Sequence, residues 1–384
     1  MPPPQAIPAR TIGSASFDPE SFTEAWKEGQ YGPPTDNDLR GAIIKAFGLK
    51  ETDEYVYHAI ASVTLSQVQV AINHGSEGGL HAWYKEEDGK LIPPPPPADI
   101  NAYTSIFSST TSTPKALTGF ASNAKKNSLR ASIATHLQSN LLLPHPSTTS
   151  LTLPSKLKTP HTNPYYDIWA WTCRTLEWAG PTPSTVHTHQ SHHILPILYH
   201  HFSCICPSYD ALSLLSQLST LHKPTPRSIL EIGSGNGYWA FLLRRLGITV
   251  HAVDNGASAW RTMWIADTIY TDGARYLKEH NGGRDAVLLL VYPQVGADFT
   301  GKMLRAYEGD TIVVAGTQNR NGFTGFRGEV VSEWMEREMS GWRRVVQVPL
   351  PSFAGKDEAL FVFMKGGVDG GSEGKSKESG IRES

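Results

Sequence analysis

The pattern of apolar and polar positions divides the chain into an irregular N-terminal part and a regular C-terminal part. Beyond residue 226, short apolar runs of strand length recur at 229–232, 249–253, 286–291 and 311–315. Segments with apolar residues at helical spacing, such as 238–246 and 299–307, lie between them. Continuous apolar strands that alternate with helices predict a parallel sheet covered on both faces.

Two further apolar runs, 344–348 and 359–364, follow each other without an intervening helix. This spacing predicts an antiparallel strand pair that closes one edge of the sheet. The predicted fold class is therefore α/β, with a doubly wound, mostly parallel sheet, an antiparallel C-terminal strand pair and a helical, partly disordered N-terminal extension.

Helical spacing is also present before residue 226, but in shorter and more scattered pieces. It predicts a helix that begins at Thr35 or Asp36, a second from Thr52 or Asp53 to about residue 72, and a weak one over 127–143. An aromatic segment at 164–178 and a run of leucines after Ser208 predict two more helices before the first strand.

Proline, serine and threonine concentrate between these helices and set the predicted boundaries. These are a loose N-terminus at 1–34, a small helical region at 35–92, a Pro/Ser/Thr-rich linker at 93–164, a domain at 165–365 with its core at 227–365, and a disordered tail at 366–384. Five consecutive prolines at 93–97 predict polyproline II, either as a spacer or as a ligand for an SH3-type domain. The Pro/Ser/Thr-rich region is thus the candidate surface for a protein partner.

Charge and composition narrow the function classes. Lys and Arg number 34 against 36 Asp and Glu, a formal charge of −2, which disfavours binding to nucleic acid or acidic membrane through bulk charge. Three cysteines cannot form a disulfide framework, which favours a reducing compartment. No apolar run is long enough to span a membrane, and the first residues resemble neither a secretory signal nor a transit peptide. We expect a cytoplasmic protein, with the nucleus left open.

Candidate chemistry concentrates in the segment 227–255. A buried strand leads through Glu231 into a loop in which every second residue is glycine: Gly233, Ser234, Gly235, Asn236 and Gly237. A helix begins at about residue 238, and a second strand ends at Asp254, seventeen residues past Gly237. Residues without side chains let backbone amides approach a ligand, and a carboxylate after the second strand can accept two ribose hydroxyls. This arrangement indicates a nucleotide-binding βαβ unit.

The dinucleotide fingerprint G-x-G-x-x-G requires glycine at position 238, where this chain has Tyr238. An NAD-dependent oxidoreductase is therefore disfavoured. The spacing G-x-G-x-G, with an acidic residue two positions before the first glycine, resembles motif I of the class I S-adenosylmethionine-dependent methyltransferases. The resemblance covers 227–365, about a third of the chain. It implies a Rossmann-like, seven-stranded sheet, S-adenosyl-L-methionine as cofactor and methyl transfer to an unidentified acceptor, a small molecule or protein rather than nucleic acid. The segments 163–171 and 207–210 look, more loosely, like those of poorly characterised fungal and bacterial methyltransferase-like proteins.

The same resemblance implies roles for individual residues. Glu231 would support the loop and contact the ammonium of the cofactor indirectly, and 233–237 would line the cofactor. Asp254 would bind the ribose diol, with Asn255 beside the adenine. Asp272 and Gly273 stand where the family places an acidic residue and a backbone amide against the adenine ring, although an ordinary turn or helix cap explains them as well.

The residues that would meet the methyl acceptor stay unassigned. Methyltransferases that act on amino groups place Asn or Asp, then two prolines and an aromatic residue, after the fourth strand, whereas this chain has Val291, Tyr292, Pro293 and Gln294. The missing polar residue disfavours methylation of a base nitrogen. Tyr292 and Gln294 face the transferred methyl group, or Tyr292 only packs on the cofactor. The alternative function is a non-catalytic cofactor-binding or interaction protein on the same fold.

A histidine-rich segment offers a different hypothesis, a zinc site. Neutral imidazoles and thiolates bind zinc, and the segment contains His187, His189, His192, His193, His200, His201, Cys204 and Cys206. The C-x-C spacing is atypical for structural zinc, and the surrounding Thr, Ser, Gln and Pro favour a solvated insertion between two helices. We therefore predict no metal site.

Overall fold

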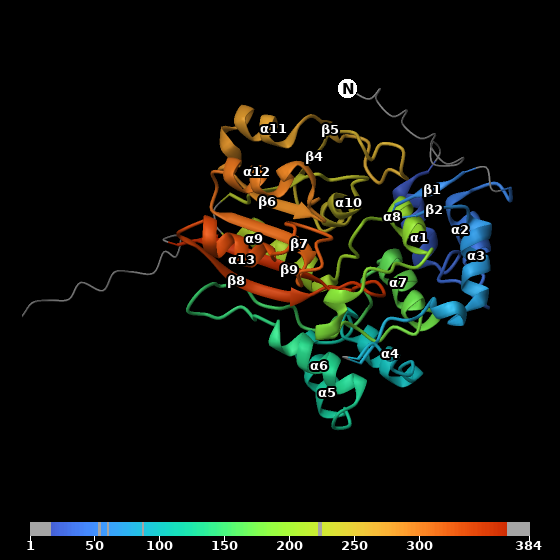
Figure 1. The fold of residues 1–384 in the computed structure, drawn as a ribbon. Helices are drawn as coiled ribbons and strands as arrows, with labels where there is room; N and C mark the ends of the chain where they lie inside the picture. The colour runs from blue at the N-terminus through green and yellow to red at the C-terminus, as the bar shows by residue number, and fades with distance from the viewer. Residues whose placement is uncertain (1–16, 53–54, 60, 87, 222–224, 367–384) are drawn as a thin grey trace, which may run out of the picture.

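The computed structural model describes residues 17–52, 55–59, 61–86, 88–221 and 225–366. At its centre lies a seven-stranded sheet with the order β5-β4-β3-β6-β7-β9-β8 (Figure 1). Its strands are β3 (Ser228–Ile232), β4 (Val250–Asp254), β5 (Ile269–Tyr270), β6 (Ala286–Val291), β7 (Thr311–Thr317), β8 (Trp342–Pro349) and β9 (Glu358–Lys365). The strands β5, β4, β3, β6 and β7 pair in parallel, and β9 runs antiparallel to both β7 and β8. The predicted fold class is confirmed, including the antiparallel strand pair at the C-terminal end of the chain.

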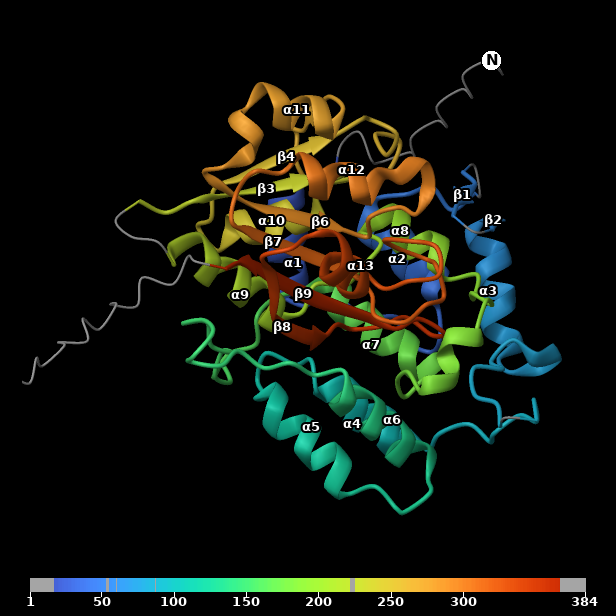
Figure 2. The same cartoon turned by 60° about the vertical axis from the view of Figure 1, so that its left-hand side comes forward.

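The central strands are apolar throughout because helices cover both faces of the sheet (Figure 2). Along β3, Ile229 belongs to the hydrophobic cluster of one face and Leu230 to that of the other. The first face packs on α9 (Tyr209–Thr220) and α10 (Tyr238–Arg245), and the second on α11 (Gly273–Glu279), α12 (Phe299–Ala306) and α13 (Val331–Glu338). This two-sided burial is why the strands could be predicted from short apolar runs.

The strand order reverses direction between β3 and β6. From β3 the chain proceeds to β4 and β5 on one side, and then returns to place β6 and β7 on the other. In open α/β sheets, ligands bind outside the carboxyl ends of the strands at such a switch point. Here the loops at that point begin at Gly233, after β3, and at Tyr292, after β6. The topology therefore brings together two segments that lie far apart in the sequence.

The N-terminal part is mostly helical. Its helices are α1 (Pro19–Lys27), α2 (Leu39–Phe47), α3 (Leu65–His74), α4 (Pro97–Ser105), α5 (Thr113–Ser122), α6 (Leu129–Ser139), α7 (Pro164–Thr175) and α8 (Leu195–His201). A two-stranded hairpin, β1 (Tyr57–His58) and β2 (Ser62–Val63), precedes α3. Short 3-10 turns of this part are η1 (Glu77–Gly79) and η2 (Pro183–His187), while η3 (Asn281–Gly283) and η4 (Gly296–Asp298) flank β6 of the sheet. The predicted helices near 36–47, 127–143, 164–178 and 208–221 are confirmed as α2, α6, α7 and α9.

Three sequence-based expectations for this part were wrong. Helix α1 lies in the segment predicted to be loose, where Asp18 caps it and Phe22 and Trp26 are buried. The second predicted helix begins only after Thr64, because the hairpin β1–β2 occupies its first half. The Pro/Ser/Thr-rich linker, predicted to hold one weak helix, contains two further packed helices, α4 and α5, besides α6. Short helices with few apolar positions give weak periodicity, so tertiary packing decides whether they form.

The N-terminal part and the sheet share one hydrophobic cluster, and polar contacts tie them together. The Arg245 guanidinium on α10 donates to Glu24 Oε1 on α1 at 3.1 Å, and Leu142 exchanges backbone hydrogen bonds of 2.8 and 2.9 Å with Gln347 on the edge strand β8. Since the core continues across residue 165, the predicted domain boundaries stay predictions. The expected loose first residues and the tail beyond 366 lie outside the described residues.

Within the described ranges, no helix is both long and apolar enough to cross a membrane. The cytoplasmic location and the protein partner at the Pro/Ser/Thr-rich region remain predictions.

Candidate functional site

The glycine loop leaves β3 at the switch point of the sheet. Gly233, Gly235 and Gly237 have φ angles of 75°, 60° and 78°, in the left-handed region that side chains disfavour. The backbone N–H groups of Gly233 and Ser234 both donate to Val253 O, at 2.8 and 3.1 Å. The alternating glycines of the motif are thus required by the backbone of this loop, which folds back against the end of β4.

Asp254, the last residue of β4, fastens the loop. Its Oδ2 accepts a hydrogen bond of 2.9 Å from the Gly235 N–H, and its Oδ1 accepts one of 2.8 Å from the Gly256 N–H. Burial raises the pKa of this carboxyl, while the two backbone donors and the nearby Arg261 oppose that rise. A carboxylate oxygen can accept more than one hydrogen bond, so Asp254 keeps capacity for a ligand while it holds the loop.

Glu231 lies deeper, on β3 beneath the loop, with 1% of its surface exposed. Burial raises its pKa to about 8; the Ala240 amide opposes that rise and the charge of Asp254 adds to it. Its Oε2 and the hydroxyl of Ser234 have no hydrogen-bond partner among the described residues. Buried polar atoms without partners cost about 1–3 kcal/mol each. Their position under the glycine loop therefore fits a site that receives polar groups from a ligand.

The segment 256–265 covers the loop from the side of β4, and the sequence did not reveal this. The Trp264 N–H donates to Asn236 O at 2.8 Å, and the Asn236 side-chain amide donates to Thr262 O at 3.1 Å. Ile265 lies directly over Gly237, where a Cβ atom would be 2.4 Å from its Cγ1. Gly237 is thus required by a close approach as well as by its φ angle.

Tyr292 follows β6 at the same edge of the sheet, in the left-handed region with φ 50°. Its N–H donates to Ala315 O at 2.8 Å, and its ring centroid lies 5.7 Å from that of Tyr199 on α8. Burial is the main cause that raises the pKa of its hydroxyl. Gln294, in contrast, is exposed. The switch point thus brings Tyr292 to the edge that carries the glycine loop, while its role toward a cofactor stays a prediction.

The residues predicted to lie near an adenine ring are placed on the surface side of this region. Asn255 is exposed, and its side chain accepts from the Ala257 N–H at 2.9 Å. Asp272 is exposed and caps α11 by accepting from the Arg275 N–H at 2.9 Å. Asp272 therefore acts as a helix cap, as one of the two interpretations of the sequence expected. A contact of Asn255 or Asp272 with a nucleotide stays a prediction.

Gly273 has a packing role of its own. A Cβ atom at this position would lie 2.4 Å from Cγ2 of Ile232 and 2.8 Å from Sδ of Met303. Glycine thus allows α11 to pack closely against the carboxyl end of β3.

The histidine-rich segment was expected to be a solvated insertion, which holds for the exposed His187 and His189 and is wrong for the later histidines. His192, His200 and His201 are 2%, 0% and 0% exposed, and the last two belong to α8. His201 contacts the Tyr57 hydroxyl at 3.0 Å and the Thr262 hydroxyl at 2.9 Å, which links the N-terminal hairpin to the segment over the glycine loop. Over the described ranges, no group of three or more His, Cys, Asp or Glu residues is arranged to hold a metal ion.

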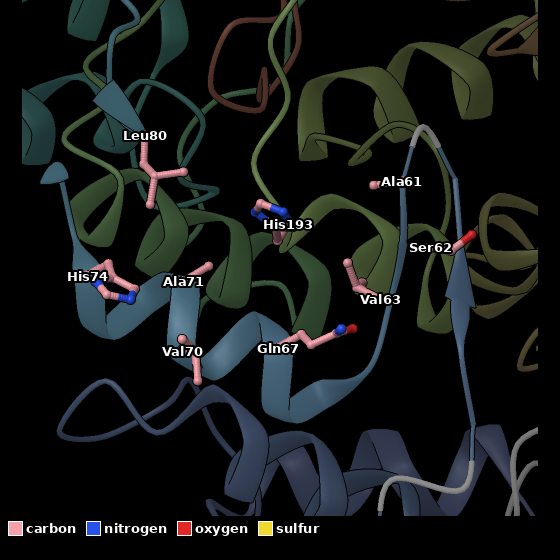
Figure 3. A pocket seen from close by; sticks show the side chains of 9 residues that line it. All are labelled: Ala61, Ser62, Val63, Gln67, Val70, Ala71, His74, Leu80 and His193. Carbon is pink, nitrogen blue, oxygen red and sulfur yellow. The ribbon is translucent and has the colours of Figure 1, made fainter. Parts of the chain in front are cut away.

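A groove of about 360 Å³ lies away from this edge, between α3, β2 and the segment before α8 (Figure 3). It is lined by Ala61, Ser62, Val63, Gln67, Val70, Ala71, His74, Leu80 and His193. None of these residues belongs to the glycine loop or to the end of β6, so the groove is separate from the candidate site.

No family model matches the chain, and no curated protein matches it. Among solved structures, a protein of the NADB-Rossmann superfamily from Streptococcus agalactiae is similar at 13% identity and a TM-score of 0.27, over 40% of this chain and 67% of that one. Magnesium protoporphyrin IX methyltransferase from Synechocystis, solved with bound S-adenosylmethionine, is similar at 12% identity and a TM-score of 0.27, over 36% and 70%. A glycopeptide N-methyltransferase in complex with S-adenosylmethionine is similar at 11% identity and a TM-score of 0.26, over 40% and 93%. Similarity at this level is too low to assign a ligand or a reaction to this chain.

Proposed function

We propose that the chain is an S-adenosylmethionine-dependent methyltransferase that acts on a small-molecule or protein acceptor. The observation that carries this proposal is the Asp254 carboxylate, which lies at the end of β4 and is bonded to the Gly235 N–H of the glycine loop. A carboxylate in this position, at the end of the second strand beside the glycine loop, is suited to a ribose diol. The unpartnered Oε2 of Glu231 beneath the loop supports the same assignment.

Two features distinguish this site from a dinucleotide site. The third glycine of the dinucleotide fingerprint is replaced by Tyr238, which is buried and donates its hydroxyl to Asn163 Oδ1 at 2.8 Å. The dinucleotide fold has the strand order 3-2-1-4-5-6, whereas here the antiparallel β9 is inserted between β7 and β8. Both features favour a mononucleoside cofactor.

In the proposed complex, the backbone amides of 233–237 surround the methionyl part of the cofactor, and Asp254 accepts hydrogen bonds from the ribose. Glu231 supports the loop from below, and Asn255 with Asp272 and Gly273 borders the adenine. When bound, the cofactor supplies a methyl group on a sulfonium centre. The contribution of the chain is then mainly alignment, which holds the acceptor in line at about 3–3.5 Å, and this can work without a strong base.

A direct test is calorimetric titration with S-adenosylhomocysteine. We expect binding in the micromolar range for the wild type. Asp254→Ala should weaken it by tenfold or more, because hydrogen bonds to a charged group contribute about 1.5–3 kcal/mol each. Asp285→Ala is the matched control, since this exposed carboxylate precedes β6 at the opposite edge of the sheet. A wild-type chain that binds neither S-adenosylmethionine nor S-adenosylhomocysteine contradicts the proposal.

The second candidate is a non-catalytic cofactor-binding protein. It is favoured by the residues after β6, where Val291, Tyr292 and Pro293 provide no Asn or Asp to orient an attacking amine. Incubation of the chain with methyl-labelled cofactor and a cell extract separates the two candidates. A labelled product supports the transferase, whereas tight cofactor binding without any labelled product supports the non-catalytic protein.

A further inference from the structure

Three consecutive charged residues, Lys356, Asp357 and Glu358, are buried in the turn that leads into β9. Their exposed fractions are 1%, 0% and 4%. Glu358 pairs in register with Thr317, the last residue of β7, so the turn lies at the carboxyl edge of the parallel strands. Burial of three charges in one tripeptide is costly unless each is paired. The hydrogen-bond and charge partners of each side chain therefore show why its burial is tolerated.

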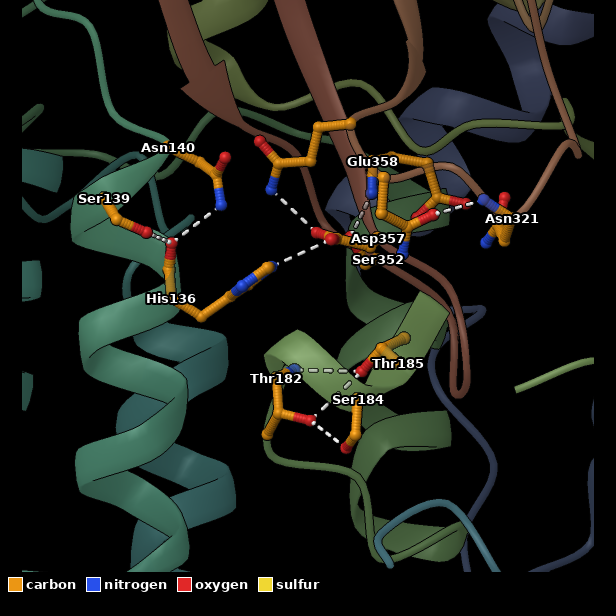
Figure 4. A network of polar contacts seen from close by, with 12 residues as sticks. His136, Ser139, Asn140, Thr182, Ser184, Thr185, Asn321, Ser352, Asp357 and Glu358 are labelled. Atoms are coloured by element: carbon orange, nitrogen blue, oxygen red, sulfur yellow. Dashed lines mark hydrogen bonds and ion pairs between the residues drawn. The ribbon is translucent and has the colours of Figure 1, made fainter. Parts of the chain in front are cut away.

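Asp357 is fully partnered. Its Oδ2 lies 2.8 Å from His136 Nε2 on α6, as Figure 4 shows, and its Oδ1 accepts from Gln318 Nε2 at 2.7 Å. Gln318 in turn accepts from the side-chain amide of Gln347 at 3.0 Å. This network fastens the turn to the end of β7 and to the N-terminal helices, which explains why Asp357 is buried.

The side chains of Lys356 and Glu358 are less completely hydrogen-bonded than that of Asp357. Lys356 Nζ and Glu358 Oε2 have no hydrogen-bond partner among the described residues, although the ring of Phe323 lies 3.1 Å from Nζ. Burial is the main cause that lowers the pKa of Lys356 and raises that of Glu358, and the opposite charge of each residue opposes the shift of the other. Apolar residues would hold the turn at lower cost than a buried ion pair. The two unbonded atoms thus point to a ligand that supplies hydrogen-bond partners to this pair.

The backbone of the turn is held rigidly. The indoles of Trp169 and Trp178 both donate to Ser352 O at 3.0 Å, and the Ser352 hydroxyl accepts from the Glu358 N–H at 2.8 Å (Figure 4). A binding site needs this kind of support, because side chains on a fixed backbone lose little entropy when they bind.

The turn also lies close to the residue that follows β6. The loop that carries Phe323 is tied to the β6 loop by a hydrogen bond of 2.8 Å from the Gly325 N–H to Pro293 O. Burial raises the pKa of Tyr199 and that of Tyr292, and the charge of Glu358 adds to both rises. Lys356 and Glu358 therefore belong to the same edge as Tyr292, on the side of the glycine loop toward β7 and β9.

We propose that Lys356 and Glu358 form the acceptor subsite, and that the acceptor is a small aromatic acid with a hydroxyl or amino group. This inference rests on the proposed function. The Lys356 ammonium pairs with the carboxylate of the acceptor, and Glu358 accepts a hydrogen bond from its hydroxyl or amine. The rings of Tyr199, Tyr292 and Phe323 favour a flat, apolar body between the two polar ends.

The test uses the full chain with S-adenosylhomocysteine present and 4-hydroxybenzoate as the probe, observed by ligand NMR. The neutral amide of the same acid, 4-hydroxybenzamide, is the matched probe without a charge. We expect 4-hydroxybenzoate to bind, the amide to bind at least tenfold more weakly, and K356M and E358Q each to weaken the acid by tenfold or more. K365M is the control, since Lys365 is exposed at the far end of β9.

Thermal denaturation of the same variants distinguishes a binding role from a structural one. We expect K356M to unfold at a lower temperature than the wild type, because it takes the opposite charge away from the buried Glu358, so its loss of binding counts only below that unfolding temperature. Failure of the wild type to bind the acid at ~10 mM, or equal binding by the wild type, K356M and E358Q, overturns the inference. If K356M does not fold, the inference is tested by the binding of 4-hydroxybenzoate to E358Q and by the binding of 4-hydroxybenzamide to the wild type. Binding of S-adenosylhomocysteine in these samples tests the proposed function separately, so a failed subsite and a failed cofactor site give different results.

Discussion

Replacement of Gly237 by alanine tests the geometry of the loop over which the segment 256–265 folds. Gly237 has φ 78° and is the N-cap of α10, and a Cβ atom there would lie 2.4 Å from Cγ1 of Ile265. Gly247, just beyond the other end of the same helix, has φ 79°, and a Cβ atom there would meet no heavy atom within 4 Å. The two glycines thus share a backbone conformation and differ in what surrounds them.

The expected magnitudes follow from this difference. Alanine in the left-handed region costs about 1–2 kcal/mol, which is the whole expected effect of Gly247→Ala. Gly237→Ala adds the cost of an overpacked contact, about 1–3 kcal/mol, for a total of about 2–5 kcal/mol. The free energy of unfolding, measured by urea denaturation for both variants, should therefore fall further for Gly237→Ala.

A double-mutant cycle separates the clash from the backbone term. In an Ile265→Ala background, Gly237→Ala should cost only about 1–2 kcal/mol, since the atom that it meets is gone. If Gly237→Ala costs no more than Gly247→Ala, or if Ile265→Ala leaves its cost unchanged, then Ile265 does not lie over the glycine loop. The packing of the segment 256–265 over the glycine loop, as described above, would then be wrong.

Two further predictions concern the buried His200 and the partly buried His136. His200 has no exposed surface, and burial is the main cause that lowers its pKa to about 3, so the folded chain keeps it neutral. The unfolded chain binds the proton below pH ~6.5, and stability should fall between about pH 6.5 and 3 by up to about 1.4 kcal/mol per pH unit. His200→Phe should flatten this slope in denaturant titrations at several pH values; an unchanged slope contradicts the assignment. His136→Ala removes a partner of the buried Asp357 and should cost about 3–5 kcal/mol in the same assay, whereas the exposed His145→Ala should change stability by less than ~0.5 kcal/mol. Equal effects of the two substitutions would show that His136 does not support the turn.

Six of the seven strands and the glycine loop could be predicted from local patterns in the sequence. Six apolar runs beyond residue 226 became six strands, because strands covered by helices on both faces must be apolar along their whole length. The left-handed φ angles of the loop likewise require the glycines that form the motif. Both features depend on residues that are close together in the chain, so a local pattern is enough to find them.

The tertiary structure decided what surrounds that loop. The strand β5 is only two residues long, and Ile269 and Tyr270 are exposed, so no apolar run marks it. The polar residues before His200 and His201 in the sequence predicted a solvated segment. In the structure, α8 is buried by aromatic side chains such as Tyr57 and Phe47, which lie more than 140 positions earlier in the chain. Their environment depends on long-range contacts, which leave no periodic signal in the sequence.

The acceptor subsite illustrates the same division. Lys356, Asp357 and Glu358 read in the sequence as an ordinary polar turn between two strands. Only the packed structure buries all three, gives Asp357 its partners from α6 and from the end of β7, and leaves Lys356 Nζ and Glu358 Oε2 without a hydrogen-bond partner in the described part of the chain. The position of the glycine loop could be predicted from the sequence, because that loop is made by one short segment. The residues of the proposed acceptor subsite come from several distant segments, and only their packing against one another places them at one edge of the sheet.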